Sequence, residues 1–182
     1  MGGLQKALMV VEGRAIVDRQ LEALAGRVTA IAVALAPASD SQTEFEARGL
    51  LCLRDREPDL GPIAGLSVAL EWADGQPLLA IACDMPFLTS AALELILSRG
   101  ADADLAVPWA QDRWQPLLAS YGAAMRPVTE AAIRRGSLRL ADLPDAARAA
   151  GLRVDEIHEA ELRTRDPDLA SLRNFNRPSD PI

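Results

Sequence analysis

Cysteine and histidine are scarce in this sequence of 182 residues, which contains two cysteines and one histidine. Cys52 and Cys83 form neither a zinc-binding spacing nor a disulfide framework, and both fall in apolar segments that we expect to be buried strands. His158 lies in a polar stretch, which predicts a surface position. The composition therefore excludes a disulfide-stapled fold and disfavours zinc sites and histidine-based catalytic triads.

The sequence also lacks a long hydrophobic run and an excess of basic residues. No apolar segment approaches the length needed to span a bilayer, and the first residues lack the apolar core of a signal peptide. We therefore expect a cytoplasmic protein with no membrane partner. With 26 acidic and 19 basic residues the formal net charge is -7, which disfavours nucleic acid as a partner but permits a local nucleotide site.

The residues that are present are typical of one globular domain. Apolar residues make up 49% and charged residues 25% of the chain, which has no repeat, linker or low-complexity segment. The length suits one α/β domain over residues 1–182 and is too short for two. Apolar residues at helical spacing predict helices at residues 15–24, 41–48, 63–73, 90–98, 126–135 and 138–150. Short apolar runs predict strands at residues 28–36, 50–53, 77–83, 105–108, 115–121 and 154–157.

The stretch from Gly61 to Phe87, GPIAGLSVALEWADGQPLLAIACDMPF, organises the rest of the chain. It predicts a turn, the helix at 63–73, and the strand at 77–83, which is followed directly by Asp84. An uninterrupted apolar strand after a helix is typical of a central parallel strand that is buried on both faces. Since open α/β sheets bind ligands at the carboxyl ends of their strands, Asp84 is the first candidate for chemistry.

A carboxylate at this position suits a hard cation such as magnesium, which shares oxygen ligands with substrate phosphates. The alternative is that Asp84 caps the following helix, although Thr89 or Ser90 could do so instead. Asp55 follows the strand at 50–53 in the same way, and its alternative is one charge in a mixed surface cluster. The loop at 109–113 could line a pocket, but we expect Trp109 and Trp114 to pack rather than to stack on a ligand.

Four motifs in one order give the chain a resemblance to a known family. GPIAG at 61–65, CDMPF at 83–87, MGGLQKAL at 1–8 and NFNRPSD at 174–180 resemble successive motifs of the molybdenum cofactor guanylyltransferases, the MobA-type nucleotidyltransferases. The resemblance implies a single MobA-like NTP transferase domain with a Rossmann-like three-layer α/β/α fold. It also implies a mostly parallel sheet, with the strand at 115–121 antiparallel.

The chain departs from the family at its start. Members begin with a strand and a glycine-rich loop of the form LAGGxSxRMGxxK, and this sequence begins at the Met of that motif. We therefore expect the first strand and most of the glycine-rich loop to be missing, which would leave a gap between the strands at 28–36 and 77–83. Our hypothesis is a start site placed too far downstream. The rival explanation is a real truncation whose gap is filled by the N-terminal residues or a partner chain.

The resemblance also implies roles for particular residues. Catalysis would fall to Asp84, as the magnesium ligand, and to Lys6, on the triphosphate. Asp55 would bind the base or the ribose. The nucleotide-binding residues implied are Lys6, Asp55, Gly61, Pro62, Gly65 and Asp84. The acceptor-binding residues implied are Arg139, Asn174 and Asn176.

The activity implied is guanylyl transfer from GTP to molybdopterin or the molybdenum cofactor, with Mg²⁺ as cofactor and pyrophosphate as product. Contact with cofactor-biosynthesis or molybdoenzyme partners is also implied. Two alternatives stay open. One is a related nucleotidyltransferase that uses CTP or another phosphorylated acceptor, and the other is a non-catalytic nucleotide-binding protein that has lost its phosphate loop.

Overall fold

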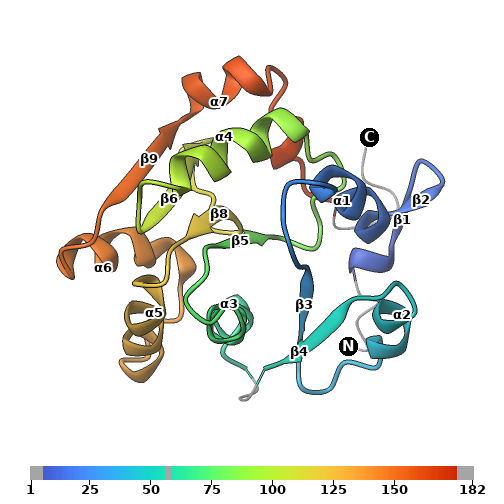
Figure 1. Ribbon diagram of the computed structural model, residues 1–182, viewed down its shortest axis with the longest axis horizontal. Helices are drawn as coiled ribbons and strands as arrows, with labels where there is room; N and C mark the ends of the chain where they lie inside the picture. Colours follow the sequence, from blue (N-terminus) through green and yellow to red (C-terminus); the bar gives the residue numbers. More distant parts are fainter. Residues whose placement is uncertain (1–5, 56–58, 176–182) are drawn as a thin grey trace.

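A computed structural model describes residues 6–55 and 59–175 and shows an α/β fold with helices on both faces of a sheet (Figure 1). Its α-helices are α1 (Ile16–Leu24), α2 (Gln42–Glu46), α3 (Pro62–Trp72), α4 (Ser90–Gly100), α5 (Met125–Arg134), α6 (Leu143–Ala149) and α7 (Glu159–Arg165). Its strands are β1 (Val10–Val11), β2 (Arg14–Ala15), β3 (Ala32–Leu35), β4 (Leu51–Arg54), β5 (Leu78–Ile81), β6 (Leu105–Ala110), β7 (Arg113–Trp114), β8 (Leu118–Tyr121) and β9 (Val154–His158). Three 3-10 helices complete the chain: η1 (Lys6–Leu8), η2 (Leu140–Asp142) and η3 (Ala170–Leu172).

Two hydrophobic clusters, one on each face of the larger sheet, hold the layers together. Leu105 and Val107 of β6 pack with residues of α3, α5 and α6, whereas Ala106 and Ala110 pack with residues of α4 and α7. This division follows from the alternation of side chains along a strand. The layers are therefore helix, sheet and helix, as expected from the sequence.

The prediction of a mostly parallel sheet is confirmed only in part, because the sheet is mixed. β8 lies between β5 and β6 and is antiparallel to both, whereas β6 and β9 are parallel, as are β3 and β4. The antiparallel direction of β8 was expected. The physical reason for the mixture is that β7 and β8 follow β6 through short turns, and a short connection can join only antiparallel neighbours.

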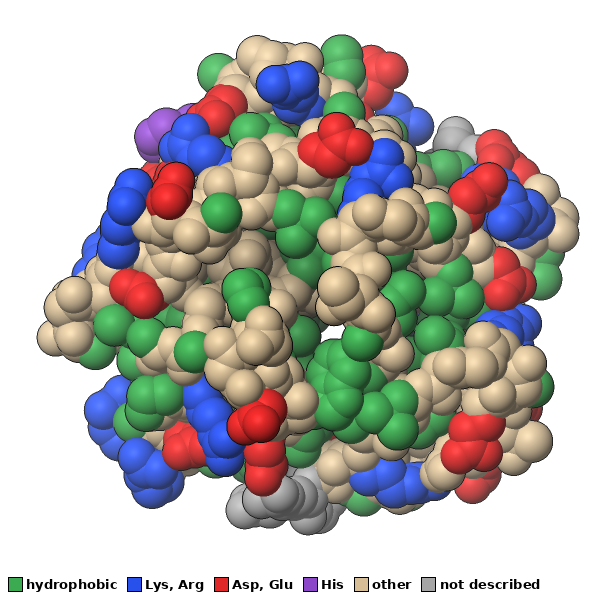
Figure 2. Space-filling view, in the orientation of Figure 1, with side chains coloured by type: hydrophobic (Ala, Val, Ile, Leu, Met, Phe, Trp, Pro, Cys, Tyr) green, Lys and Arg blue, Asp and Glu red, His purple; other side chains and the backbone are tan. Residues whose placement is uncertain are grey.

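β5 does not have the two strand neighbours that a central strand requires. Among the described residues it pairs only with β8, and β3 pairs only with β4, so no strand joins β3 to β5. All four residues of β5 are half-buried rather than buried, although all four are apolar. Figure 2 shows a hollow near the middle of this face with hydrophobic side chains around it. The interruption lies between β3 and β5, where the sequence analysis expected a gap.

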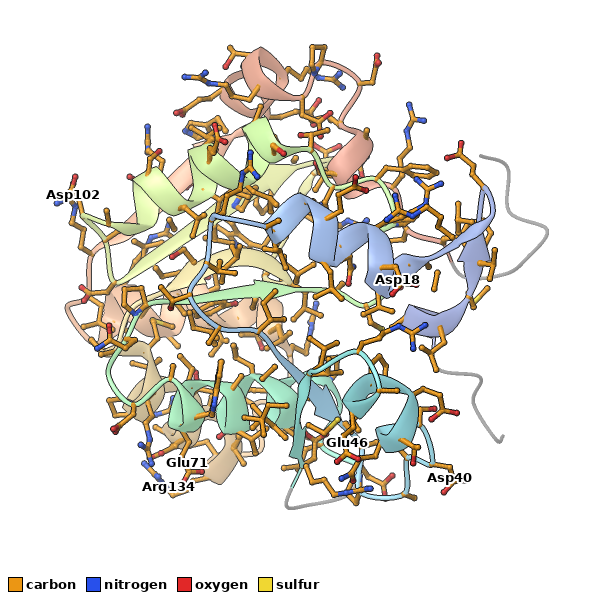
Figure 3. The ribbon with its side chains drawn as sticks, turned by 45° about the vertical axis from the view of Figure 1, so that its right-hand side comes forward. Asp18, Asp40, Glu46, Glu71, Asp102 and Arg134 are labelled. Atoms are coloured by element: carbon orange, nitrogen blue, oxygen red, sulfur yellow. The ribbon has the colours of Figure 1, made fainter. Side chains whose placement is uncertain are left out.

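Side-chain contacts attach the smaller sheet, β3 with β4, to the rest of the molecule. Arg48, just after α2, donates to the Asp18 carboxylate of α1 at 2.8 Å, and Figure 3 shows Asp18 between the two helices. α3 packs against β3, β4 and β5, and thereby spans both sheets. The two sheets are therefore held side by side through helices.

The two cysteines are more exposed than the sequence pattern predicts. Cys52 lies in β4 but is only half-buried, and Cys83 lies beyond the end of β5 and is exposed. Both departures have one cause, because the strands around the interruption are shorter and less covered than central strands. Within the described ranges, no helix is long and apolar enough to cross a membrane.

Candidate active site at the carboxyl end of β5

Asp84 lies three residues beyond the end of β5, in the loop that leads to α4. The structure resolves the alternative that Asp84 caps α4. The Thr89 hydroxyl accepts a hydrogen bond from the Ala92 backbone N–H at 3.2 Å, so Thr89 is the cap. The Asp84 carboxylate is therefore not needed for the helix start, and its side chain is only 16% exposed.

Lys6 is the partner of this carboxylate. Its ammonium Nζ lies 3.2 Å from Asp84 Oδ2, across 78 residues of sequence. The Lys6 side chain is 43% exposed, so the ion pair is partly accessible to solvent. The structure thus brings together the two residues for which the sequence predicted catalytic roles, and the roles themselves stay predictions.

Three hydrogen bonds that sequence reasoning missed hold the Asp84 loop in place. The Gln20 side-chain amide of α1 donates to the Ala82 carbonyl at 2.8 Å and to the Met85 carbonyl at 3.1 Å. The Phe175 backbone N–H donates to the Asp84 carbonyl at 2.7 Å. No local signal could have shown these contacts, because the partners are distant in sequence and the acceptors are backbone atoms.

A small hydrophobic cluster lies beneath Lys6 and Asp84. Met9, Val11, Ile16 and Phe175 are buried together, and Phe87 packs against them. The cluster thus combines residues that flank Lys6, the chain just after Asp84, and the C-terminal segment. Burial of apolar surface therefore fixes the relative positions of the three segments that form the site.

Asp55 follows β4 directly and contains an unusual polar atom. Its Oδ1 is buried and has no hydrogen-bond partner in the described part of the chain. Burial raises the pKa of the Asp55 carboxyl above its ordinary value, because water no longer stabilises the charged form. A buried acceptor without a donor is costly unless a ligand supplies the donor, so Asp55 is a candidate ligand-binding group.

Gly65 allows α3 to lie close to Asp55. A Cβ at this position would come within 3.1 Å of the Ala34 Cβ and 3.7 Å of Asp55 Oδ1. A larger residue would push α3 away from β3 and fill the space beside the unpaired oxygen. A side chain at this position would therefore require Ala34 or α3 to shift by a few tenths of an ångström.

The turn before α3 is also set by its residues. Gly61 has φ 70 and ψ -158, a conformation that side chains disfavour, and Pro62 occupies the first turn of the helix. Backbone N–H groups at a helix start favour an anionic ligand. Gly61, Pro62, Gly65 and Asp55 are therefore neighbours on one side of the site.

The predicted acceptor residues are only partly brought together. Asn174 is exposed and directly precedes Phe175, whose N–H is bonded to Asp84, so Asn174 lies beside the Asp84 loop. Arg139 is exposed before η2, and no hydrogen bond or ion pair joins it to Lys6, Asp55 or Asp84 within the described residues. Asn176 lies outside the described residues. The structure thus supports the placement of Asn174 and leaves Arg139 apart.

The described residues fit a magnesium ion only if substrate phosphates supply some of its ligands. Within residues 6–55 and 59–175 no group of three or more histidine, cysteine, aspartate or glutamate side chains could hold a metal. Asp84 offers one carboxylate, and magnesium is commonly held by one or two carboxylates together with substrate phosphates. The described residues therefore fit an ion that is shared with phosphates, rather than a metal site built from protein alone.

Comparison with known proteins gives a family match and related sequences. The model of the MobA-like NTP transferase domain family matches residues 1–148. A probable molybdenum cofactor guanylyltransferase from Methanothermobacter thermautotrophicus is 30% identical over 98% of this chain and 89% of the relative. A molybdenum cofactor guanylyltransferase from Desulfosudis oleivorans is 27% identical over 96% of this chain and 83% of the relative.

Solved structures show the same fold. The molybdopterin-guanine dinucleotide biosynthesis protein A of Archaeoglobus fulgidus matches with a TM-score of 0.73 and 25% identity, over 97% of this chain and 86% of its own. The 2-C-methyl-D-erythritol 4-phosphate cytidylyltransferase of Thermus thermophilus matches with a TM-score of 0.69 and 19% identity, over 95% and 88%. The second likeness concerns the fold alone.

Proposed function

This chain belongs to the MobA-like NTP transferase domain family, and we propose that it transfers a guanylyl group from GTP to the phosphate of molybdopterin or of the molybdenum cofactor. Relatives named as molybdenum cofactor guanylyltransferases, similar to this chain over nearly its whole length, support the acceptor. The products would be the guanine dinucleotide form of the cofactor and pyrophosphate. The proteins that use this product would be its partners.

The observation that supports GTP is the unpaired oxygen of Asp55. A carboxylate accepts hydrogen bonds, and guanine presents two adjacent donors, the N1–H and the exocyclic amine. The oxygen lies beside Gly65, where an added Cβ would come within 3.7 Å of it. A guanine that donates to this oxygen would satisfy the buried carboxylate, which has no donor among the described residues.

The transfer needs no covalent enzyme intermediate. An oxygen of the acceptor phosphate forms a bond to the α-phosphorus of GTP, and the bond from that phosphorus to pyrophosphate breaks. Because the acceptor is already anionic, the protein has to align the two reactants and offset their negative charge. Magnesium, when bound, would draw charge from the phosphate oxygens.

Each predicted residue has a task in this scheme. Asp84 would hold the metal, and Lys6 would move its ammonium from Asp84 to the phosphates when they arrive. Gly61 and Pro62 would set the start of α3 near the phosphates or the base. Asn174 and Asn176 would bind the acceptor with amide groups that both donate and accept, and Arg139 would supply a guanidinium on the acceptor side.

Isothermal titration of GTP, CTP and ATP with magnesium tests the proposal. We expect GTP to bind most tightly and Asp55→Ala to lower GTP affinity by roughly 10- to 150-fold, the loss typical of a hydrogen bond to a charged group. Asp59→Asn, a change of an exposed carboxylate four residues away at a φ of 66 that asparagine tolerates, is the matched control. Tighter binding of CTP would replace the proposal with cytidylyl transfer, and binding of no nucleotide would refute nucleotidyl transfer by this chain.

A further inference from the structure

Trp109 lies at the same edge of the sheet as Asp84. β5 and β6 are both antiparallel to β8 and therefore parallel to each other. Leu78 and Leu105 both lie opposite Tyr121, and a count of four residues along each strand puts Trp109 level with Ala82, two residues before Asp84. Two strand spacings separate β5 from β6, which corresponds to roughly 10 Å.

Trp109 also lies on the same face of the sheet as the start of α3. Leu105, Val107 and Trp109 occupy every second position of β6 and therefore share one face of the sheet. Leu105 and Val107 belong to the cluster that contains Ile63 and Leu66 of α3. Leu105 and Val107 are covered by this cluster, whereas Trp109 is 36% exposed. This face of β6 is therefore buried at Leu105 and Val107 and exposed to solvent at Trp109.

The exposed indole is held rigidly. The Trp109 and Trp114 rings make an edge-to-face contact with centroids 4.9 Å apart, and the Arg148 guanidinium lies 5.4 Å from the Trp114 ring centre. The turn between the two tryptophans has positive φ at Gln111 and Asp112, which is typical of the tightest hairpin connection. An exposed ring that is already immobile loses little conformational freedom when a ligand stacks on it.

Ion pairs fix the support behind this ring. Arg148 of α6 donates to Asp145 at 3.0 Å and to Glu156 of β9 at 3.2 Å. Glu159 accepts from the Gln111 backbone N–H at 2.8 Å, which ties the hairpin turn to the start of α7. These contacts fix the hairpin that carries Trp109 and Trp114.

Trp109 and Asp55 lie on opposite sides of Asp84. Figure 1 shows β3 and β4 on one side of β5 and β6 and β9 on the other. Asp55 follows β4, and Trp109 is the last residue but one of β6. If the base of the nucleotide lies at Asp55 and the phosphates at Asp84, the region around Trp109 is left for the second substrate.

We propose that Trp109 is a stacking platform for the planar ring system of the phosphate-bearing acceptor. The ligand class is a flat heteroaromatic ring joined to a phosphate, with the phosphate at Asp84 and the ring on the indole. This assignment rests on the proposed function, and it replaces the expectation that Trp109 serves packing alone. A stacked base is worth roughly 5- to 150-fold in affinity.

The test titrates a pterin that carries a phosphate ester on its side chain and follows tryptophan fluorescence. In the parent protein we expect quenching, and in Trp109→Leu we expect the pterin Kd to rise about tenfold or more, within the range for stacking. Trp109→Tyr keeps an aromatic face and should bind within about threefold of the parent. Trp72→Phe, at the far end of α3, is the matched control and should keep both affinity and quenching.

The outcomes separate this inference from the proposed function. GTP affinity, measured by isothermal titration, should change less than about twofold in Trp109→Leu, because the base lies on the other side of Asp84. Equal pterin affinity in the parent and Trp109→Leu would overturn the inference and leave guanylyl transfer standing. GTP binding by the parent without any pterin binding would overturn the inference and the assigned acceptor. Failure of the parent to bind GTP would refute the proposed function itself.

Discussion

Asp84 is predicted to affect catalysis far more than folding. Asp84→Asn keeps the size of the side chain and removes its charge, so it should lower turnover by roughly a thousandfold or more while the thermal midpoint changes little. The Lys6–Asp84 pair is partly exposed, which limits its contribution to stability. Asp74→Asn, at the opposite end of β5, is the control, because asparagine tolerates its φ of 45. Normal turnover by a folded Asp84→Asn protein would remove Asp84 from the mechanism.

Asp55 is predicted to make stability depend on pH. Burial raises the pKa of its carboxyl in the folded protein above the ordinary value of 3.8, so the folded state holds its proton more tightly than the unfolded state. The stabilisation that this gives is complete below pH 3.8 and is lost as the pH rises through the folded pKa. Asp55→Asn should therefore flatten the pH dependence of the free energy of unfolding above pH 3.8, as measured by urea unfolding. An unchanged pH dependence would show that the carboxyl is solvated.

At the level of elements, the sequence predicts what is encoded locally. The helix at 63–73 and the strand at 77–83 correspond to α3 and β5, because apolar spacing and the turns at Gly61 and Gly75 specify both. A gap beside β5 was expected and no described strand joins β5 to β3, but the predicted burial of the strand was wrong, since the cover of a strand depends on segments far apart in sequence. The contacts of Gln20 and Phe175 with the Asp84 loop were missed for the same reason.

The interruption between β3 and β5 predicts uneven protection of backbone amides. β6 pairs with both β8 and β9, whereas β5 pairs only with β8 in the described chain. Amides of β5 that point away from β8 should exchange with solvent faster than those in the middle of β6, because edge groups open at lower free energy. Hydrogen exchange followed by NMR measures this directly, with β6 as the internal control. Equal, strong protection of all β5 amides would show that another segment covers this edge.

On the scale of the whole molecule, the candidate site joins two sheets that share no hydrogen bonds among the described residues. Asp55 comes from the smaller sheet and Asp84 from the larger, and α3 lies against both. A ligand that contacts Asp55 with one end and Asp84 with the other would therefore add a connection that the protein alone lacks. Such a ligand would favour the relative position of the two sheets in which both contacts can form at once.

GTP with magnesium is accordingly predicted to stabilise both sheets together. At a free concentration 100 times its Kd, GTP should raise the free energy of unfolding by about 2.7 kcal/mol and protect amides in β3 and β4 as well as in the Asp84 loop. Guanosine should protect only the end of β4, and pyrophosphate with magnesium only the Asp84 loop, because each contacts one sheet. At the same free concentration as GTP, the two fragments added together should stabilise less than GTP, since joining them removes the entropy cost of a second binding event. Protection of one sheet alone by GTP would mean that the base and the phosphates do not bind across the interruption.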